Sequence, residues 1–587
     1  MCGIIGYSGS RDAAPLIKSG LESLEYRGYD SCGILVVNGE MEILKNIGKI
    51  KDVLVNTDFL KTKGKLGIGH TRWATHGGVT VENSHPHLSN NREIAVAHNG
   101  IIENYQELRD FLKKEGFVFS SETDSEIIPN LIELHMRDKS FFESVKASLK
   151  QLEGSYALVI VSLKDKLLVG ARKESPLVVG VGDGEYFIAS DIPAFLEYTK
   201  NVIYLEDGDI VLLNGDMKIF NLHEGNDVER PISTVAWDVE QAKKGDFDHF
   251  MLKEMTEQAD VISKSIGQSQ EMIDDVVVEI KKAKNIYFVG CGTAYHACLT
   301  GCYFFSKIAK IRCEALLGSE FLTKIDLVDK GDVVIAVSQS GETADTLEGV
   351  RAAKAKGAKI LSIVNVMGST LVRESDLSIL QNAGPEICVL STKSYTSQLA
   401  ILALLTYALI GELEEGKSKL KELIRYIFYL TSWRMRLQIR NLAGRLKDVD
   451  HIYLIGRGFQ YPTAMEAALK IKEVSYIHAE GFAGGELKHG SIALIEKDTP
   501  CIVFASKETE KQIVSNALEL KARGAYIIGV GPNDNEVFDY FIKVREADVA
   551  NSICQIIPIQ ILAYQLALLR GCDPDKPRNL AKSVTVK

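Results

Sequence analysis

The sequence predicts a multidomain α/β protein in which a domain of antiparallel strands and helices precedes two copies of a parallel-sheet domain. A chain of 587 residues is too long for one hydrophobic core and, at about 100 to 200 residues per domain, predicts three to five domains. Short strand patterns separated by turns fill residues 2–222. After residue 245, buried apolar strands alternate with long helical patterns, and this succession occurs twice.

The composition is that of a folded chain without nucleic-acid or membrane partners. Hydrophobic residues make up 46% and charged residues 25%, which argues against disorder. Asp and Glu outnumber Lys and Arg by 78 to 68, so no net positive field would attract a phosphate polymer. The longest uninterrupted apolar run, 399–411, is shorter than the ~18 residues of a membrane span, and no basic segment typical of a signal peptide opens the chain.

The ten cysteines indicate a reducing, cytoplasmic location. They include no CxxC pair, so the sequence predicts neither a disulfide scaffold nor a zinc site. We expect no metal.

Paired strands and intervening helices organise residues 2–222. The turn residues Asn214 and Gly215 separate two strand patterns, 209–213 and 217–220, which is a strong hairpin signal. Helical periodicity is expected at 13–25, 104–116 and 124–136. Residues 223–248 are polar and lack apolar periodicity, and therefore predict a linker.

The second half of the chain contains an internal repeat. Segment 286–292, IYFVGCG, matches segment 452–458, IYLIGRG, and each reads as a buried strand that ends in a glycine turn. A dinucleotide fold would require a third glycine where Tyr295 and Tyr461 stand, so that fingerprint fails twice. We expect a first copy at 249–415, a helical bridge at 416–445, a second copy at 446–577 and a C-terminal tail at 578–587.

Cys2 is a candidate nucleophile. If Met1 is removed, Cys2 carries a thiol and a free α-amino group of pKa about 7.7 to 8.0, which can act as the base for that thiol. The alternative is a small apolar residue opening a strand. Asn99 and Gly100 offer a side-chain amide and a backbone N–H suited to a developing oxyanion, although Asn-Gly is also a common turn.

Taken together, these residues resemble the class II glutamine amidotransferase domain of the N-terminal nucleophile hydrolases. The segments that carry the resemblance are CGIIG at 2–6, YRGYDS at 26–31, HTRWATHG at 70–77 and HNG at 98–100. The resemblance covers about residues 2–222 and implies an α/β/β/α sandwich that releases ammonia from glutamine. It implies that Cys2 is the nucleophile and that Asn99 and Gly100 form the oxyanion hole. It further implies that glutamine is bound by a group of residues in which Arg27 also supports the cysteine. The other members of this group are Arg72, Trp73, His76 and Asp124.

A hydroxyl-rich loop follows the strand pattern 333–337 and predicts a phosphate site. Backbone N–H groups at a helix start can cradle one phosphate, and several hydroxyls here can add to them. The alternative is simple helix capping by Ser340 or Thr343. The residues of the loop that would bind phosphate are Ser338, Gln339, Ser340 and Thr343.

Three charged residues, Glu466, Lys470 and Glu473, share one stripe of a predicted helix. A solvated face with weak ion pairs is the usual meaning of such a stripe. His489, which precedes Gly490, offers a group that can shuttle protons near neutral pH.

Both repeats resemble the sugar-isomerase (SIS) domain, with a parallel-sheet αβα sandwich of flavodoxin-like topology. Segments 481–490 (GFAGGELKHG) and 577–586 (PRNLAKSVTV) extend the resemblance to the whole chain, which looks like the glutamine-dependent amidotransferases that act on fructose 6-phosphate. This implies conversion of D-fructose 6-phosphate and L-glutamine to D-glucosamine 6-phosphate and L-glutamate, the first step of hexosamine biosynthesis, without a cofactor. It also implies a homodimer in which His489 reaches the partner subunit's sugar site.

The same resemblance assigns further roles in the sugar site. Glu473 would move a proton between C1 and C2, His489 would assist ring opening, and Lys582 would form an imine with the open-chain ketose. Residues implied in sugar-phosphate binding are Thr293, Ser338, Gln339, Ser340, Thr343, Val389, Ser391 and Lys470. The chain departs from the family pattern at Ala294, where serine is usual, and at Leu390, where alanine is common.

Three other function classes are alternatives. A sugar-phosphate isomerase or deglycase would leave the Cys2 domain without a role. A sugar-phosphate-sensing regulator would need a basic recognition helix, which the acidic N-terminal domain does not offer. Other class II amidotransferases carry nucleotide-binding segments that are absent after residue 245.

Overall fold

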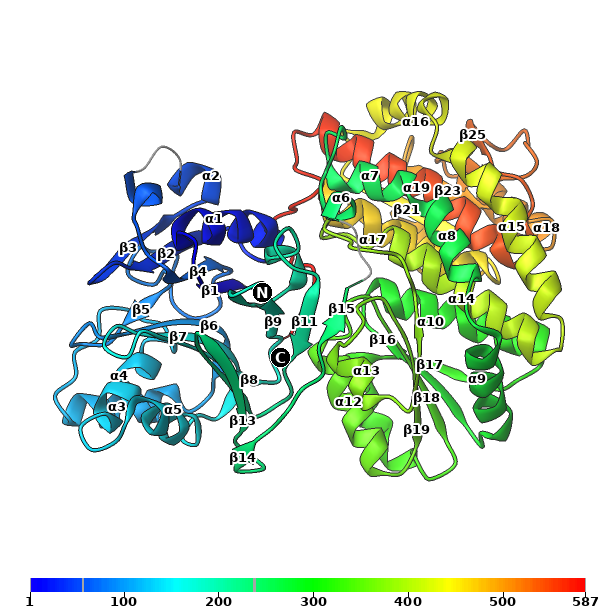
Figure 1. Ribbon diagram of the computed structural model, residues 1–587. Helices are drawn as coiled ribbons and strands as arrows, with labels where there is room; N and C mark the ends of the chain where they lie inside the picture. The colour runs from blue at the N-terminus through cyan, green and yellow to red at the C-terminus, as the bar shows by residue number, and fades with distance from the viewer. Residues whose placement is uncertain (1, 55–57, 236–238, 586–587) are drawn as a thin grey trace. The chain divides into compact units, whose positions relative to one another are not determined.

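The computed structural model describes residues 2–54, 58–235 and 239–585, except for the side chains of residues 239 and 240 (Figure 1). The chain divides into two compact units. Unit 1 comprises residues 1–242 and 581–587, and unit 2 comprises residues 243–580.

Unit 1 contains two antiparallel sheets. The eight-stranded sheet has the order β15-β11-β9-β10-β1-β4-β2-β3, and the seven-stranded sheet has the order β14-β13-β12-β8-β7-β6-β5. The first sheet consists of β1 (Gly3–Ser8), β2 (Ser31–Val37), β3 (Met41–Ile47), β4 (Leu66–Arg72), β9 (Val178–Val181), β10 (Tyr186–Ala189), β11 (Asn201–Tyr204) and β15 (Ser233–Thr234). The second consists of β5 (His87–Leu88), β6 (Ile94–Ile102), β7 (Gly154–Ser162), β8 (Leu167–Lys173), β12 (Asp209–Asn214), β13 (Asp216–Asn221) and β14 (Asn226–Asp227).

The two sheets pack face to face between helical layers. Ile4 and Ile68 of the first sheet share one buried cluster with Val159 and Val211 of the second. Helix α1 (Ala13–Leu24) covers the first sheet, while α3 (Tyr105–Lys114), α4 (Ile127–His135) and α5 (Phe141–Leu149) lie on the far side of the second (Figure 1). The α/β/β/α sandwich expected for this part of the chain is therefore confirmed.

The predicted helices and hairpin of unit 1 are present with small shifts at their ends. The pattern at 124–136 becomes a helix only at Ile127, because the Glu126 carboxylate binds the backbone N–H groups of Ser120 and Ser121 before α4 begins. Within the predicted linker 223–248, β14 pairs with β13 and β15 pairs with β11, so these short segments extend the two sheets. Helix α6 (Val239–Ala242) follows them.

Unit 2 contains two five-stranded parallel sheets of the same topology. Their orders, β17-β16-β18-β19-β20 and β22-β21-β23-β24-β25, both follow the flavodoxin-like 2-1-3-4-5 pattern. The strands of the first sheet are β16 (Ile286–Gly290), β17 (Glu314–Leu317), β18 (Val333–Ser338), β19 (Lys359–Val364) and β20 (Leu377–Leu380). Those of the second are β21 (His451–Gly456), β22 (His478–Ala483), β23 (Pro500–Phe504), β24 (Tyr526–Gly531) and β25 (Tyr540–Lys543).

Helices cover both faces of each sheet in unit 2. One large buried cluster joins the inner faces of the two sheets, with Phe288 and Leu402 from the first copy and Ile471 and Ile557 from the second. Its helices are α7 (Phe250–Thr256), α8 (Gln258–Ile266), α9 (Gln270–Lys282), α10 (Thr293–Phe304), α14 (Lys393–Leu409), α15 (Leu413–Leu430), α16 (Trp433–Leu446), α17 (Gln460–Ser475) and α19 (Asn551–Leu569). The outer faces carry α11 (Gly318–Phe321), α12 (Ala344–Ala355), α13 (Thr370–Glu374) and α18 (Glu510–Lys521). The two tandem parallel-sheet domains expected from the repeat are confirmed.

Among the described residues, one helix is long and apolar enough to cross a membrane by its length and composition alone. This stretch, Asp548–Leu569, is not an uninterrupted apolar run, because Asn551, Gln555 and Gln560 interrupt it. Of its most apolar window, 89% is buried inside unit 2, as for the core helix of a globular domain.

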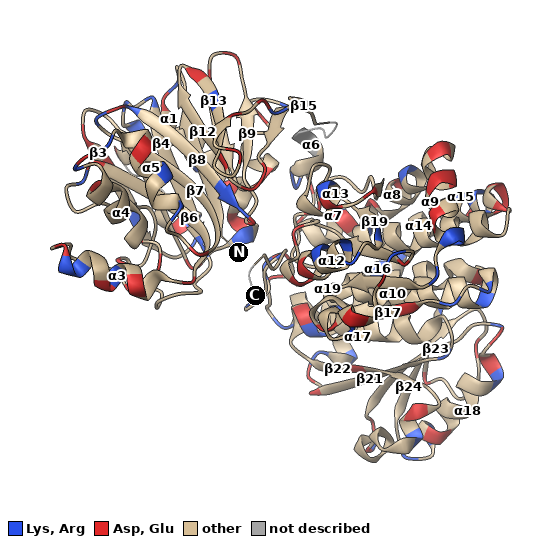
Figure 2. Ribbon diagram, turned by 90° about the horizontal axis from the view of Figure 1, so that it is seen from below, with Lys and Arg blue, Asp and Glu red and all other residues tan. Residues whose placement is uncertain are grey.

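Lys and Arg are interspersed with Asp and Glu along helices such as α3 and α18, whereas the central strands β21, β23 and β24 carry neither (Figure 2).

Candidate active sites

Cys2 lies directly before β1, beside the end of β4. The Trp73 backbone N–H donates to Cys2 Sγ at 3.2 Å, and the thiol lies 3.4 Å from the Trp73 carbonyl oxygen. Burial raises the pKa of the Cys2 thiol, although the Trp73 N–H and the Arg72 guanidinium oppose this shift. The thiol is therefore held in its protonated form and requires a base to become a nucleophile. Met1, whose removal would free the α-amino group, lies outside the described residues.

Asn99 is oriented toward Cys2 by a histidine. Asn99 Nδ2 donates to the Cys2 carbonyl oxygen at 2.8 Å. His70 Nε2 lies 3.1 Å from Asn99 Oδ1 and 3.1 Å from the His98 carbonyl oxygen. Because both partners are acceptors, His70 Nε2 carries the proton, and its N–H fixes the amide with the nitrogen facing Cys2.

Two glycines allow the backbone to approach closely around this site. Gly100 has φ +133°, and a Cβ there would lie 2.1 Å from the Ser155 carbonyl oxygen. At Gly28 a Cβ would lie 2.7 Å from the carbonyl carbon of Arg72. Side chains at these positions would displace β6 or the end of β4, so the site needs glycine at both.

The residues implied in glutamine binding gather at the ends of β4 and β6. Arg72 donates to the carbonyl oxygens of His76 and Gly78, at 2.5 and 2.9 Å, and so orders the loop after β4. Asp124 is buried and accepts the Ile102 N–H at 2.9 Å. Trp73 packs edge-on against Tyr29, and His76 packs edge-on against Tyr105.

Arg27 lies in a buried network with Tyr26 and Asp191. Its guanidinium forms a buried ion pair with Asp191 at 2.6 Å, and Tyr26 donates its hydroxyl to the same carboxylate at 2.5 Å. This buried network fixes the guanidinium in one position, and the role of Arg27 toward Cys2 stays a prediction.

Sequence reasoning missed a cluster of buried histidines next to Asn99. His70 stacks on His85 with ring centroids 4.1 Å apart, and His85 meets His87 edge-on at 4.5 Å. Burial lowers the pKa of His70 to about 3 and the pKa values of His85 and His87 well below the usual range. The rings are therefore neutral at physiological pH. His85 and His87 flank Pro86, whereas His70 lies on β4, so only the His85-Pro86-His87 segment gives a local signal of the cluster.

In unit 2, the hydroxyl-rich loop lies between β18 and α12 as predicted. Ser338 Oγ accepts the Gly341 N–H at 2.9 Å, and Ser340 Oγ accepts the Glu342 N–H at 3.2 Å. Thr343 stands at the N-cap of α12, but its side chain makes no capping hydrogen bond. The Thr343 hydroxyl therefore does not serve as a helix cap. It lies 3.5 Å from Ser338 Oγ.

Two of the three charges on the α17 stripe are buried and the third, Glu473, is partly buried, so the alternative of a solvated face is wrong. Glu466 and Lys470 are each 0% exposed. Lys470 Nζ lies 2.7 Å from Glu473 Oε2 and 3.3 Å from Glu466 Oε1, and it donates to Thr293 Oγ1 at 2.9 Å. Burial disfavours the ammonium, but the two carboxylates outweigh that effect and raise the pKa of Lys470.

This network joins the two parallel-sheet domains. His296 Nδ1 lies 2.7 Å from Glu466 Oε2, and Thr293 Oγ1 donates to Glu466 Oε1 at 3.1 Å. Thr293 and His296 belong to α10 of the first copy, whereas Glu466 and Lys470 belong to α17 of the second. Helical spacing alone could not reveal a partner on a helix so distant in sequence.

The other predicted sugar-site residues differ in burial and in contacts. Val389 is buried, and its backbone N–H donates to the Asp575 carbonyl oxygen. Ser391 is partly buried, and the backbone carbonyl of Gln339 accepts the Asn365 N–H. His489 ends the short 3-10 segment Glu486–His489 and is exposed, and its imidazole makes no hydrogen bond to any residue in the described part of the chain. Lys582 lies in the tail segment grouped with unit 1.

The two departures from the family pattern lie beside this site. Leu390 is fully buried in the core cluster of unit 2, and Ala294, in the first turn of α10, is partly buried against it.

Comparisons with known proteins find relatives of both the amidotransferase part and the SIS part of the chain. The SIS domain family matches residues 279–408 and 445–570, and the glutamine amidotransferase domain family matches residues 70–197. The chain is 46% identical to glutamine–fructose-6-phosphate aminotransferase (isomerizing) of Thermococcus kodakarensis and 45% identical to that of Methanothermobacter thermautotrophicus, with 100% of both chains covered in each case. Among solved structures, the C-terminal domain of glucosamine-fructose-6-phosphate aminotransferase from Francisella tularensis is 35% identical, covers 57% of this chain and 99% of its own, and has a TM-score of 0.53.

Proposed function

This chain belongs to the family of glutamine–fructose-6-phosphate aminotransferases (isomerizing), and we propose from this premise how its own residues carry out that reaction. The enzyme converts D-fructose 6-phosphate and L-glutamine to D-glucosamine 6-phosphate and L-glutamate, the entry reaction of hexosamine synthesis. Residues 2–222 form the glutaminase domain, residues 223–248 the linker, and 249–415 and 446–577 the two SIS domains, bridged by 416–445 and followed by the tail 578–587.

The glutaminase half uses Cys2 as its nucleophile. After removal of Met1, the α-amino group takes the thiol proton, and the thiolate attacks the side-chain amide carbon of glutamine. The raised pKa of the buried thiol supports the need for such a base. The thioester then yields glutamate on attack by water, and ammonia is the leaving group of the first step.

One observation carries this half of the proposal: Asn99 Nδ2 lies 2.8 Å from the Cys2 carbonyl oxygen, with its orientation set by His70. An amide N–H fixed beside the nucleophile, together with the Gly100 N–H, forms an oxyanion hole that needs little reorganisation. Arg72 and Asp124 bind the α-carboxylate and α-ammonium of glutamine, and Trp73 and His76 line the same pocket. Arg27, held in place by Asp191, supports Cys2.

The sugar half uses the loop after β18 as the phosphate cradle. The helix α12 N-terminus and the hydroxyls of Ser338, Ser340 and Thr343 bind the phosphate, with Gln339, Thr293, Val389 and Ser391 around the sugar. Glu473 transfers the proton between C1 and C2. Its contact with Lys470 supports this role, because a carboxylate held by a buried ammonium keeps one orientation.

The remaining groups complete the sugar site. Lys582 forms the imine with the open-chain ketose, and His489 of a second subunit assists ring opening. The exposed position of His489 supports its action on a partner chain. The enzyme is a cytoplasmic homodimer in which ammonia passes from the Cys2 site to the sugar site.

A coupled assay tests the whole proposal. Purified protein incubated with glutamine and fructose 6-phosphate is expected to form glutamate and glucosamine 6-phosphate in equal amounts. Cys2→Ala should abolish both products from glutamine, whereas Cys572→Ala, at a partly buried cysteine outside both sites, should retain them. Glutamate release by Cys2→Ala would contradict the assignment of the nucleophile.

A further inference from the structure

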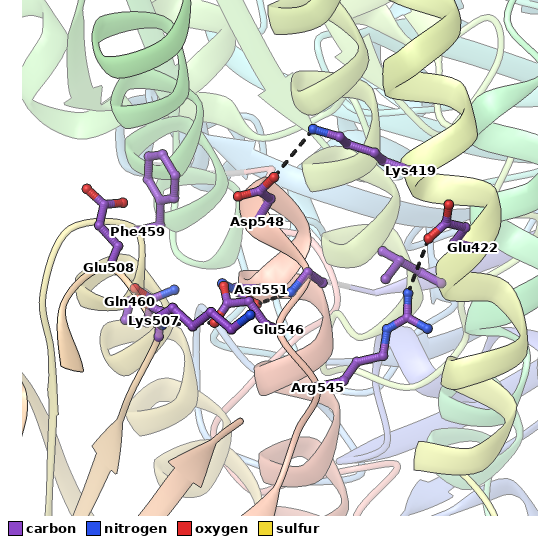
Figure 3. A pocket seen from close by; sticks show the side chains of 13 residues that line it. Lys419, Glu422, Phe459, Gln460, Lys507, Glu508, Arg545, Glu546, Asp548 and Asn551 are labelled. Carbon is purple, nitrogen blue, oxygen red and sulfur yellow. Dashed lines mark hydrogen bonds and ion pairs between the residues drawn. The ribbon is translucent and has the colours of Figure 1, made fainter. Parts of the chain in front are cut away.

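A cavity of about 430 Å³ opens in the second SIS domain, away from the phosphate cradle (Figure 3). Its walls are the turn after β21 with Phe459 and Gln460, the loop 506–508 after β23, the segment 545–551 before α19, and one side of α15. The volume lies within the range of small-molecule sites, about 300 to 1,000 Å³.

The position of this cavity repeats that of the phosphate cradle. In a 2-1-3-4-5 sheet, the order of connection reverses between the first and third strands, and ligands bind at their carboxyl ends. In the first SIS domain these strands are β16 and β18, which lead to Thr293 and to the Ser338–Thr343 loop. In the second they are β21 and β23, which lead to Gln460 and Ser506.

Gln460 provides a second, independent indication of a ligand. Its side chain is 2% exposed and lines the cavity, yet Gln460 Nε2 has no hydrogen-bond partner among the described residues. Leaving a buried amide N–H without a partner is unfavourable, and a ligand oxygen in the cavity would satisfy it.

The cavity is lined by charges of both signs, and the carboxylates of Glu422, Glu508, Glu546 and Asp548 outnumber the cations of Lys419, Lys507 and Arg545. The Lys507 backbone N–H already donates to Glu546 Oε2 at 2.9 Å, so this loop amide is occupied by a carboxylate of the protein itself. Lys419 pairs with Asp548 at 3.3 Å, and Arg545 lies 3.6 Å from Glu422 (Figure 3). A phosphate would meet the Glu546 carboxylate, whereas sugar hydroxyls can both donate to carboxylates and accept from the Gln460 amide.

We propose that this cavity binds an uncharged polyhydroxylated ligand of monosaccharide size, with the Gln460 amide as its central hydrogen-bonding group. The duplicated domain would thus carry two sugar sites of different charge preference, one for a sugar phosphate and one for a neutral sugar. This site lies outside the proposed catalytic residues.

Calorimetric titration with D-glucose and with myo-inositol tests the proposal on the full chain. Glucose 6-phosphate is present throughout so that the phosphate cradle is occupied. We expect saturable binding of at least one of the two polyols, weakened tenfold or more by Gln460→Met. The matched variant Gln512→Met, at an exposed glutamine of α18, should bind like the wild type.

A second measurement uses only the wild type, so the test does not depend on whether Gln460→Met folds. Amide hydrogen exchange in segments 505–509 and 545–551 should slow on addition of the polyol that binds. Absence of binding by both polyols, unchanged exchange, or equal affinity of Gln460→Met would each overturn the proposal.

A different observation points to a modification site in the first SIS domain. Cys302, on α10, and Cys313, just before β17, have their sulfur atoms 3.2 Å apart, and Cys313 donates its S–H to Cys302 Sγ. Cys302 in turn lies 3.2 Å from the Cys313 carbonyl oxygen. Both residues are partly exposed.

We infer that peroxide converts this pair to a disulfide. The Cys302 thiolate attacks one peroxide oxygen, the O–O bond breaks and water leaves after protonation, which yields a sulfenic acid. Cys313 then attacks the Cys302 sulfur, the S–O bond breaks and a second water leaves, so that two thiols and one hydrogen peroxide give one disulfide and two waters. The hydrogen bond from Cys313 lowers the pKa of Cys302, which favours Cys302 as the first nucleophile. The sulfurs need to approach only from 3.2 Å to the ~2.05 Å of a disulfide.

Peptide mass spectrometry after brief treatment with hydrogen peroxide and alkylation tests this inference. A cross-linked peptide containing Cys302 and Cys313, two mass units lighter than the dithiol, is expected, and it should be absent in Cys313→Ser and in the reduced wild type. In Cys313→Ser, Cys302 should instead be trapped by a sulfenic-acid reagent. Alkylation of both cysteines after peroxide treatment that oxidises the partly exposed Cys572 would refute the inference.

Discussion

His70 Nε2 lies 3.1 Å from Asn99 Oδ1, and this contact determines which end of the Asn99 amide faces Cys2. Without it, the amide could turn and present an oxygen where the oxyanion must form. His70 is therefore a positioning residue, which acts through Asn99 and does not touch glutamine itself.

His70→Phe should lower glutaminase kcat by about 10- to 100-fold while KM changes little, since the lost interaction concerns the transition state. Phenylalanine keeps the stacking on His85 but offers no N–H. His70→Gln, whose amide can donate from a similar position, should recover much of the activity. Equal kcat values for the Phe and Gln variants would show that the ring serves packing only.

Asn99→Ala should lower glutaminase turnover by about 10²- to 10³-fold, equivalent to ~2.7 to 4 kcal/mol, because the oxyanion loses its side-chain donor. Steady-state kinetics with glutamine separate this from a binding defect. A change confined to KM would make Asn99 a substrate-binding residue instead. Synthesis from added ammonia at the sugar site serves as the control and should be retained.

The buried histidines predict that the glutaminase domain loses stability in acid. The folded state keeps His70 neutral down to its pKa of about 3, whereas the unfolded chain takes up that proton near pH 6.5. Burial shifts His85 and His87 in the same direction. The unfolded state thus binds more protons below pH 6.5, so the stabilisation is complete above that pH and is lost progressively toward pH 3.

Thermal unfolding of the full chain, followed between pH 7.5 and 4.5, measures this effect. The unfolding midpoint temperature should decrease as the pH is lowered. His87→Gln should make this pH dependence of stability shallower by up to one proton. The exposed His223→Gln is the control and should leave the slope unchanged. A midpoint that is constant over this range would contradict the burial of neutral rings.

Local patterns predicted the elements of the fold better than the contacts between them. Strand alternation and the Asn214-Gly215 turn predicted the β12–β13 hairpin, and the repeated strand-glycine pattern predicted two parallel sheets, because these features depend on neighbouring residues. The stripe of Glu466 and Lys470 suggested a solvated face, since helical spacing does not say what covers a face. Its partners, Thr293 and His296, come from another domain. The contacts of His70 are likewise set by how two sheets pack.

The buried network on α17 predicts a large cost when one member is removed. Lys470→Met leaves the buried carboxylate of Glu466 and the partly buried carboxylate of Glu473 without their ammonium, and breaking a buried pair costs about 3 to 5 kcal/mol. Adding Glu466→Gln should recover part of this loss. Urea unfolding followed by circular dichroism measures the difference, with Lys472→Met, at an exposed position of the same helix, as control. A loss as small as that of the control would argue against a buried ion pair.

A shared sugar site predicts a specific level of rescue when two inactive chains are mixed. His489→Ala and Lys582→Ala should each abolish amino-sugar synthesis, since one removes the group proposed to act in the partner and the other removes the imine-forming amine. In a hybrid dimer, one site combines the intact Lys582 of its own chain with the intact histidine of its neighbour, while the other site lacks both. Random exchange of equal amounts gives hybrids in about half of the dimers, each with one working site of two, so about a quarter of the wild-type activity should return.

Glutamine hydrolysis at Cys2 is expected in both single variants and in the mixture, and it reports that the chains are folded. If mass spectrometry showed that hybrids had formed and synthesis did not return, His489 would act within its own chain or not at all.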